Sequence, residues 1–320
     1  TNSSPILQGE ETEANWRDFH FKNHEEFLSE MPMVGPKGNH EMSGILFKKY
    51  YPFPYIEDIR ELKNGSFYWS FDYGPVHFVV LDVSEDDATE FNYKDFLGYN
   101  KRPVSYSNQT EWLDEDLSET DKFWKIVLVH SPGWSAQVGH HKNNDYIQKK
   151  LNPIFQDHGV TWVLSGHIHY FAHAQAPGDR GIRAVNYITS GGGGSNLVNI
   201  RNGGETPFEY KVEDPIYNGN PKSVYHYFKI HIKKEPALGY LFNFYVYDVN
   251  GNMFYSYTEE ASFAEQFTII SPKMISDKYS SKLKTEKYII PSFITEMNCV
   301  NSDESILNLP GLKMILQKQY

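Results

Sequence analysis

Residues 160–169 read VTWVLSGHIH, an apolar run that leads directly into two histidines. A short, nearly all-apolar run is typical of a strand that is covered on both faces of an α/β sheet. Such sheets present their functional groups at the carboxyl ends of the strands. We therefore expect His167 and His169 at that edge, with Gly166 allowing a sharp turn. Because one residue separates the two imidazoles, they can diverge toward two different ions.

Two further clusters place polar side chains in the same way. The strand predicted at Trp124–Val129 ends on His130, and the turning segment Pro32–Pro36 leads into Gly38-Asn39-His40-Glu41. Imidazole nitrogens and amide oxygens are ligands for metal ions. The three clusters therefore predict a metal site, provided that their side chains converge on one spot.

The apolar pattern predicts both strands and helices in the rest of the chain. Strands are expected at 68–72, 76–83, 124–129, 160–164, 184–189, 224–232, 241–248 and 253–257. Helices are expected at 12–31, 109–117 and 144–157, where Pro153 marks a break or a fresh start. Asn250-Gly251 predicts a hairpin turn.

The composition is ordinary for a globular protein, with 40% hydrophobic and 22% charged residues among 320. A net charge of −11 argues against nucleic acid as a partner, although local metal charge would still allow a small phosphorylated substrate. No apolar run approaches the roughly 18 residues that cross a bilayer, so no membrane span is expected. Cys299 is the only cysteine, which excludes an intrachain disulfide.

Signals for export are weak. Thr1–Glu10 has neither a basic start nor an apolar stretch, so it does not resemble a signal peptide, as would also be true of a cleaved mature form. Asn-x-Ser/Thr sequons begin at Asn2, Asn64 and Asn108, although chance alone can produce such triplets. These observations slightly favour a secreted or periplasmic location.

The order Gly-Asn-His-Glu, Val-x-x-His, Gly-His-x-His resembles the calcineurin-like metallophosphoesterase family, and most closely its purple acid phosphatase branch. Three further segments resemble that branch: YWSFDYGPVHF at 68–78, HSPGW at 130–134 and YITSGG at 187–192. The similarity covers roughly residues 12–260. It implies a four-layer αββα sandwich, with two mixed sheets flanked by helices, over residues 1–261. Residues 262–320 would form a C-terminal extension.

The resemblance also implies a dinuclear centre of two divalent or mixed-valence ions, drawn from Fe, Zn and Mn. A hydroxide held by the two metals would attack phosphorus in line with the leaving oxygen. The implied roles are one metal ion bound by Asn39, His130 and His167, the other bound by His169, general acid or charge stabilisation by His40, and substrate contact by His140 and His141.

The function implied is hydrolysis of phosphate monoesters, acting on a phosphorylated small molecule or a phosphoprotein. Because these motifs are shared across the family, a phosphodiesterase or nucleotide hydrolase is an alternative. A catalytically silent remnant that acts as a binding or scaffold protein is another. Metal content and phosphate release would distinguish the enzyme from the remnant.

The Asp-containing half of such a site has no clear match in the sequence. The family also needs an Asp-x-His after an early strand and a Gly-Asp whose carboxylate bridges both ions. Asp18-Phe19-His20 has the first spelling but lies in a helix-like stretch, and Gly178-Asp179 lies in a polar loop. We therefore expect that the chain lacks the N-terminal strands of the domain and needs a separate N-terminal fragment to complete the site.

Several other residues have two interpretations. Trp134 could cover the site or pack at its rim, and the run Gly191–Gly194 could admit phosphate or form a tight strand exit. His173 is expected at the surface or at a helix end. Asp72 and Asp82 flank strands and are expected to be structural or to lie near the site.

Overall fold

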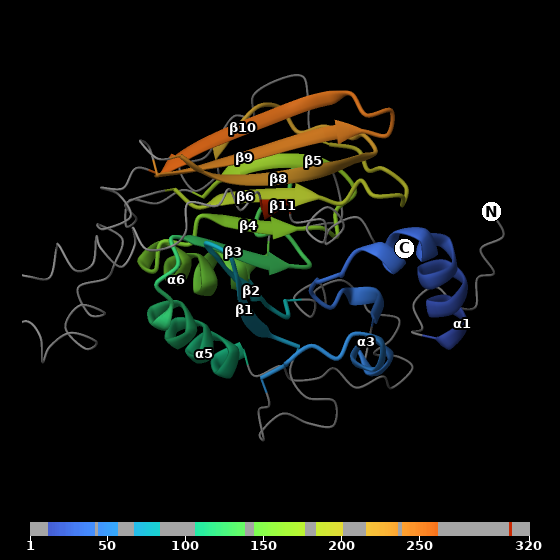
Figure 1. Ribbon diagram of the computed structural model, residues 1–320, viewed down its shortest axis with the longest axis horizontal. Coiled ribbons are helices and arrows are strands. Elements are labelled where there is room, and N and C mark those ends of the chain that lie inside the picture. The colour runs from blue at the N-terminus through green and yellow to red at the C-terminus, as the bar shows by residue number, and fades with distance from the viewer. Residues whose placement is uncertain are drawn as a thin grey trace, which may run out of the picture.

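Two β-sheets packed face to face form the body of the protein in its computed structural model (Figure 1). The structure describes residues 12–41, 44–56, 67–83, 106–137, 144–176, 184–200, 216–235, 239–261 and 307–308. Helices accompany the sheets, so the predicted α/β class is confirmed. The predicted boundary between residues 261 and 262 coincides with the end of a strand, but it stays a prediction because residues 262–306 lie outside the described ranges.

In the described part of the chain, the larger sheet has seven strands in the order β1-β2-β3-β4-β6-β5-β7. The strands are β1 Trp69–Tyr73, β2 Val76–Val80, β3 Trp124–Val129, β4 Trp162–Ser165, β5 Phe171–Gln175, β6 Asn186–Ser190 and β7 Ile216–Tyr217. Strands β2, β3, β4 and β6 run parallel to one another, so their carboxyl ends meet at one edge of the sheet. The segments that follow β3, β4 and β6 carry the predicted histidines and the glycine run.

The smaller sheet is antiparallel and has the order β10-β9-β8-β11. Its strands are β8 His226–Glu235, β9 Gly239–Asp248, β10 Met253–Ala261 and β11 Leu307–Asn308. The predicted Asn250-Gly251 turn joins β9 to β10, with Gly251 at φ 83° and its N–H donating to the Asp248 carbonyl. Gly251 suits this position because its φ is in the left-handed region.

Large aromatic rings fill the space between the two sheets. Trp162 of β4 stacks on Phe242 of β9, with ring centroids 4.6 Å apart and planes inclined by 13°. Trp124 of β3 packs against the same phenylalanine at 5.0 Å. Full burial of one such side chain contributes roughly 1.5–3 kcal/mol, so this layer is a main source of stability.

Helices cover the opposite face of the seven-stranded sheet (Figure 1). The helix α5 spans Tyr106–Glu119, and a π-helical turn at Ile147–Leu151 continues into α6 at Asn152–Asp157. Pro153 stands in the first turn of α6, directly after the helix changes from π to α type. The predicted break or fresh start at this proline corresponds to that change within a continuous helical segment.

A helical N-terminal unit lies beside the two sheets (Figure 1). It comprises α1 Glu13–Asn15, a π-helical turn Trp16–Phe21, a 3₁₀ turn Lys22–His24, α2 Glu25–Glu30 and α3 Ile45–Tyr50. Trp16, Phe47 and Phe67 form its buried core. The helix predicted at 12–31 is confirmed in place, although it is irregular in type.

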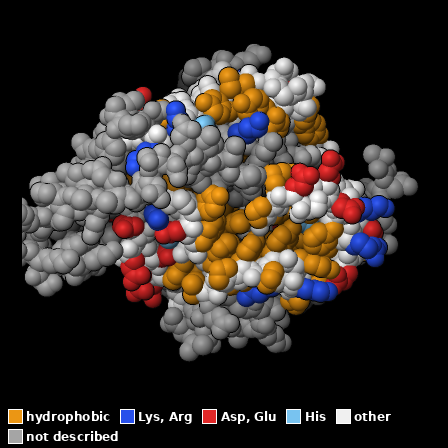
Figure 2. Space-filling model, viewed as in Figure 1, with side chains coloured by type: hydrophobic (Ala, Val, Ile, Leu, Met, Phe, Trp, Pro, Cys, Tyr) orange, Lys and Arg blue, Asp and Glu red, His pale blue; other side chains and the backbone are white. Residues whose placement is uncertain are grey.

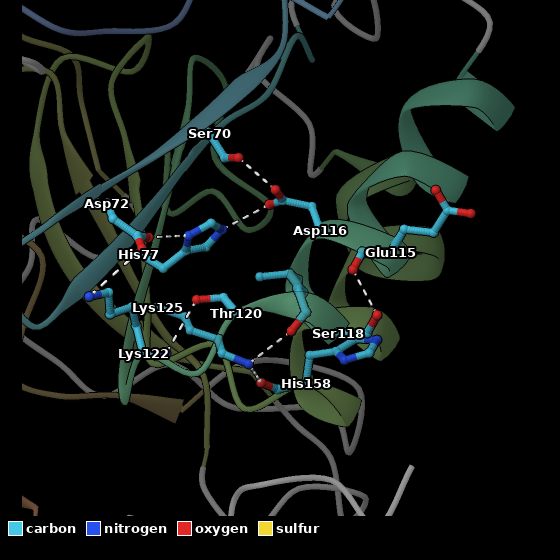
Figure 3. A network of polar contacts seen from close by, with 11 residues as sticks. Ser70, Asp72, His77, Glu115, Asp116, Ser118, Thr120, Lys122, Lys125 and His158 are labelled. Carbon is cyan, nitrogen blue, oxygen red and sulfur yellow. Dashed lines mark hydrogen bonds and ion pairs between the residues drawn. The ribbon is translucent and has the colours of Figure 1, made fainter. Parts of the chain in front are cut away.

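A polar network ties β1 and β2 to α5 (Figure 3). His77 lies between two carboxylates, with Nδ1 2.7 Å from Asp72 Oδ1 and Nε2 2.8 Å from Asp116 Oδ2. The Ser70 hydroxyl donates to the other oxygen of Asp116 at 2.6 Å. Because His77 is near the start of β2, this network lies away from the carboxyl edge, and the structural interpretation of Asp72 is the one that the contacts support.

The Lys125 side chain of β3 caps the C-terminal ends of two helical segments (Figure 3). Its buried ammonium donates to the Leu117 carbonyl at 3.0 Å and to the His158 carbonyl, at the C-terminal cap of α6, at 2.8 Å. These carbonyls have no intrahelical partner of their own. Burial lowers the pKa of Lys125 from 10.5 to about 8, against the attraction of Asp116.

This depressed pKa predicts a stability that rises with pH. Between pH 8 and 10.5 the unfolded chain binds the Lys125 proton and the folded chain does not, so the free energy of unfolding should increase across that window. We expect Lys125→Met to remove this increase. Urea unfolding of both proteins at both ends of the window measures it, and an unchanged increase in the variant would contradict the assignment.

Candidate metal centre

Three of the four predicted metal ligands converge at the carboxyl edge of the seven-stranded sheet. His130 follows β3 directly, His167 follows β4, and Asn39 lies in the short 3₁₀ turn Asn39–Glu41. His130 Nε2 lies 2.8 Å from Asn39 Oδ1 and 3.1 Å from His167 Nδ1. Asn39 and His167 are 91 and 37 residues away from His130 in the chain, yet both contact the same nitrogen of its ring.

The backbone turns at His167, whereas the sequence suggested a turn at Gly166. His167 has φ 62°, and the only described non-glycine residue with positive φ is this histidine. The Ile168 N–H donates to the Gly166 carbonyl at 2.7 Å, which closes a three-residue turn around it. A left-handed non-glycine residue stores strain of about 1–3 kcal/mol, and such strain is found preferentially at functional sites.

His169, the fourth predicted ligand, has a contact of its own outside the three converging donors. Its Nδ1 lies 2.7 Å from the Asn196 carbonyl oxygen. A carbonyl can only accept, so Nδ1 carries the proton and Nε2 of the neutral ring carries the lone pair. Metal-binding histidines typically have this second hydrogen bond to a carbonyl. His169 is therefore prepared to bind a cation through Nε2.

The surroundings of His130 keep its ring neutral. Burial is the main cause that lowers its pKa well below 6.5, and the nearby basic groups His167, His40, Lys37 and His169 lower it further. His130 is 4% exposed and His167 is 9% exposed. Neutral imidazoles offer lone pairs to a cation, whereas protonated ones would repel it.

The three converging donors fit one metal ion. Two ligands bonded at about 2.1 Å and at right angles lie roughly 3 Å apart, so the observed spacings are those of neighbouring ligands around a single ion. Two imidazoles and one amide oxygen suit Zn, Fe or Mn. All three donors are uncharged.

Within the described ranges, no three His, Cys, Asp or Glu side chains form a group that could hold a metal ion. Asp18 forms an ion pair with Arg17 at 2.8 Å on the N-terminal helices. His20 contacts the Tyr51 hydroxyl in the aromatic core of that unit. Asp18-Phe19-His20 is therefore structural, as its helix-like context suggested. Gly178 and Asp179 lie outside the described residues.

The Gly38-Asn39-His40-Glu41 turn is closed by its own side chains. Glu41 Oε2 accepts from the Gly38 N–H at 2.7 Å, the reciprocal half of a capping box. A Cβ on Gly38 would lie 2.6 Å from that oxygen and 2.8 Å from the His130 ring, so a larger residue there would displace the Glu41 carboxylate or the His130 ring. His40 is exposed in this turn, and its effect on the pKa of His130 places it near the cluster.

The remaining candidates fall into two groups. His140 and His141 lie outside the described residues, so their substrate role stays a prediction. Trp134 is buried and packs edge-on against Tyr187 at 4.7 Å, which supports the packing interpretation.

His173 was wrongly expected at the surface or at a helix end. It is 1% exposed in β5, where Nδ1 contacts the Tyr255 hydroxyl at 2.5 Å and Nε2 contacts Asn186 Oδ1 at 2.9 Å. These partners belong to β10 and β6, so the ring links the two sheets. Burial lowers its pKa to about 4.

The calcineurin-like phosphoesterase family profile matches residues 6–171, which is more than half of the chain. The chain belongs to this family. The match includes Asn39, His130, His167 and His169. Family membership thus agrees with the two-sheet fold and with the placement of the converging donors at the carboxyl edge.

The curated relatives of this family member include purple acid phosphatases. Purple acid phosphatase 23 of Arabidopsis thaliana is 28% identical over 154 residues, covering 46% of this chain and 30% of the relative. Purple acid phosphatase 15 of the same plant is 24% identical over 218 residues, covering 61% of this chain and 36% of the relative. The chain therefore spans about a third of the length of the curated relatives that it matches.

Among solved structures, purple acid phosphatase PPD1 from yellow lupin (Lupinus luteus) seeds is similar, with 14% identity and a TM-score of 0.44. The alignment covers 66% of this chain and 36% of that protein.

Asn196 and Lys37 were not assigned to the site from the sequence, whereas Asp82 was expected to be structural or to lie near the site. Asn196 contributes a backbone carbonyl, which any residue would supply, so no side-chain signal exists. Lys37 and Asp82 form a buried ion pair at 3.5 Å, although neither belongs to a recognisable motif. Only the position of Lys37 directly before Gly38 could have drawn attention to it.

Proposed function

We propose that this phosphoesterase hydrolyses phosphate monoesters with the help of bound metal. The observation that carries the proposal is the meeting of Asn39, His130 and His167 at the carboxyl edge of the sheet. Burial and a lowered pKa keep His130 in the neutral form that a cation needs. The family profile and the purple acid phosphatase relatives support the same chemistry.

In this proposal Asn39 Oδ1, His130 Nε2 and His167 Nδ1 hold one ion, and His169 Nε2 contributes to the second. A metal bound there supplies Lewis acidity and lowers the pKa of water, so that a nucleophile is present near neutral pH. The described residues orient the ligands: the Asn196 carbonyl fixes the tautomer of His169, and Glu41 closes the turn that presents Asn39.

His40 is the group proposed to act on the leaving oxygen. It is exposed next to Asn39, so a phosphate held at the converging donors lies within its reach. Protonated His40 donates a proton to the departing oxygen, or it offsets the charge that develops on the phosphoryl group. The substrate class is a phosphorylated small molecule or a phosphoprotein.

We further propose that carboxylate ligands come from polypeptide outside the described residues, such as an additional N-terminal segment of the same domain. Three neutral donors alone offset the charge of a dication poorly, and His169 is a single ligand. Figure 2 shows hydrophobic side chains spread over a broad face of the molecule. Partly buried Val34, Phe53 and Phe71 pack against the inter-sheet core, and an added segment could cover side chains of this kind.

The test is hydrolysis of p-nitrophenyl phosphate by the metal-loaded protein and by His40→Ala. General acid catalysis contributes roughly 10²–10⁴-fold, so kcat should fall by that factor. The metal content, measured by elemental analysis, should stay unchanged because His40 is not among the proposed ligands. Bis(p-nitrophenyl) phosphate, a diester, serves as the control for monoester preference.

Three results would contradict the proposal. Full kcat in His40→Ala would remove His40 from the mechanism. A folded protein that takes up no metal and releases no phosphate would favour the silent binding or scaffold alternative. Faster cleavage of the diester would favour the phosphodiesterase.

We also propose a secreted or periplasmic location, in line with the purple acid phosphatase relatives. None of the described helices has the length and apolarity to cross a membrane. Of the three sequons, Asn108 is 8% exposed in α5, so it is not available for a glycan in the folded protein. Asn2 and Asn64 lie outside the described residues.

A further inference from the structure

A buried ion pair involves Lys37, two residues before Asn39 in the chain. Lys37 Nζ is 3.5 Å from Asp82 Oδ1, and both side chains are only 3% exposed. Lys37 precedes Gly38-Asn39, while Asp82 follows β2 on the same edge of the sheet as His130. Charged side chains are rarely buried so fully, and they are then almost always paired.

The backbone of Asp82 is fixed by α5. The Asp82 N–H donates to Gln109 Oε1 at 2.8 Å, and Gln109 Nε2 donates to the Asp82 carbonyl at 3.1 Å. Gln109 is fully buried and also contacts the Tyr146 hydroxyl at 3.3 Å. The Asp82 carboxylate is therefore presented from a rigid position between β2 and α5.

Lys37 is held on its other side by the aromatic core of the N-terminal unit. Its ammonium lies 5.4 Å from the centre of the Phe67 ring. It is also close enough to His130 and Glu41 to affect both groups electrostatically. The lysine thus connects three parts of the molecule: the ligand turn, the main sheet and the N-terminal helices.

We propose that Lys37 is a positioning residue, whose ion pair with Asp82 fixes the turn that carries Asn39 and so sets Asn39 Oδ1 against His130. The proposal rests on the metal site of the proposed function, and it adds a residue to that site. Besides the pair, the turn has the local Glu41–Gly38 contact at 2.7 Å and the contact of Asn39 Oδ1 with His130 Nε2 at 2.8 Å, and the second of these is the ligand geometry that the pair is proposed to set.

Hydrogen exchange of the metal-free full chain tests the anchor directly. In Lys37→Met, amides of residues 37–41 should exchange roughly tenfold or more faster, because local opening of the turn becomes easier. Amides of β3 should not change. Lys122→Met is the matched control: that lysine pairs with Asp72 at 3.7 Å, is 29% exposed, and belongs to the network around His77.

A second variant covers the case in which a lone buried Asp82 prevents folding. Lys37→Met with Asp82→Leu removes both charges, and such replacements are often tolerated. The turn of this double variant should still exchange fast, because no ion pair anchors it. Slow exchange of residues 37–41 in either folded variant overturns the proposal.

Zinc affinity then shows whether Lys37 acts through Asn39. Lys37→Met should weaken binding of Zn²⁺ by about 10- to 100-fold, the range for lost outer-shell support, and Asn39→Ala, which removes a proposed ligand, should weaken it by at least as much. The two together should be no weaker than the more affected single variant, because the same ligand is lost. Independent, multiplying losses would overturn the proposal.

The hydrogen-exchange and zinc-affinity experiments distinguish a failure of this proposal from a failure of the proposed function. A wild-type protein that binds no Zn²⁺ overturns the metal site, while the exchange of residues 37–41 still decides whether the pair anchors the turn. A variant that loses unfolding free energy but keeps both slow exchange and zinc affinity shows a purely structural pair, which contradicts positioning.

Discussion

Gly191→Ala is expected to abolish most metal affinity while both sheets stay folded. A Cβ on Gly191 would lie 2.2 Å from the Ile168 carbonyl oxygen, 2.7 Å from its carbon and 3.2 Å from His169 Cα. All three atoms are backbone of the loop between His167 and His169, so no side chain can move aside. The loop itself must shift, and both imidazoles move with it.

The size of the effect follows from two terms. Overpacking a well-filled site costs about 1–3 kcal/mol of stability, which a sheet of seven strands can tolerate. Displaced ligands should lower zinc affinity by roughly 100-fold, at the upper end of the range for lost outer-shell support. Isothermal titration with Zn²⁺ and urea unfolding measure the two separately.

Gly192→Ala is the matched control for this prediction. A Cβ there would meet His226 Nδ1 at 2.3 Å and the Val224 carbonyl at 2.5 Å, with none of its three nearest contacts in the histidine loop. We expect a similar loss of stability and little loss of zinc affinity. Equal affinity losses in the two variants would show that a general loosening, and not the histidine loop, is responsible.

The same contacts explain why glycines occupy the first positions after β6. Gly191 and Gly192 are close-packed against the histidine loop and His226, and neither has a positive φ. The run is therefore a tight strand exit, the safer of its two sequence interpretations. A phosphate-binding role is not needed to account for these glycines.

Elements whose signal is local could be predicted from the sequence. The strand at Trp124–Val129 was predicted with its observed bounds, because its apolar run is buried throughout. The donors Asn39, His130 and His167 could be selected because each one follows an apolar or turning segment in a recognisable order. Their meeting within 3.1 Å needed the sheet topology.

Features that depend on distant partners could not be predicted. Phe171–Gln175 gives no strong strand pattern, yet it forms β5, because β6 and β7 pair with it on both sides. The burial of His173 depends on β10, which supplies the Tyr255 hydroxyl as a hydrogen-bond partner for its Nδ1 from 82 residues away. Likewise, Lys37 and Asp82 are ordinary charged residues in sequence, and only the fold encloses them together.

His77→Gln is expected to destabilise the protein most at acidic pH. Burial opposes protonation of His77, but hydrogen bonds and charge from Asp116 and Asp72 outweigh it and raise its pKa above 6.5. Two cations face the same network: Lys125 in β3, which pairs with His77 across the β2–β3 ladder, and Lys122, which is 3.7 Å from Asp72. Figure 3 shows the carboxylates of Asp72 and Asp116 on opposite sides of the ring.

The direction of the pH effect follows from that raised pKa. The folded protein keeps the His77 proton to higher pH than the unfolded chain, so the stabilisation is complete below pH 6.5 and is lost as pH rises through the folded pKa. Glutamine keeps a hydrogen-bonding amide but cannot carry the charge. The difference in unfolding free energy between wild type and His77→Gln should therefore shrink with increasing pH.

Partial exposure limits the size of this difference. Truncating a fully buried ion pair costs about 3–5 kcal/mol, but the Asp72 side chain is 51% exposed, so we expect roughly 2–3 kcal/mol below pH 6.5. His158→Gln, which removes a pair with the 62% exposed Asp114, should cost only about 0–1 kcal/mol. Urea unfolding across the pH range measures both. A His77→Gln difference that stays constant or grows with pH would show that the ring is neutral in the folded protein, and the network would then stabilise β1 and α5 through hydrogen bonds alone.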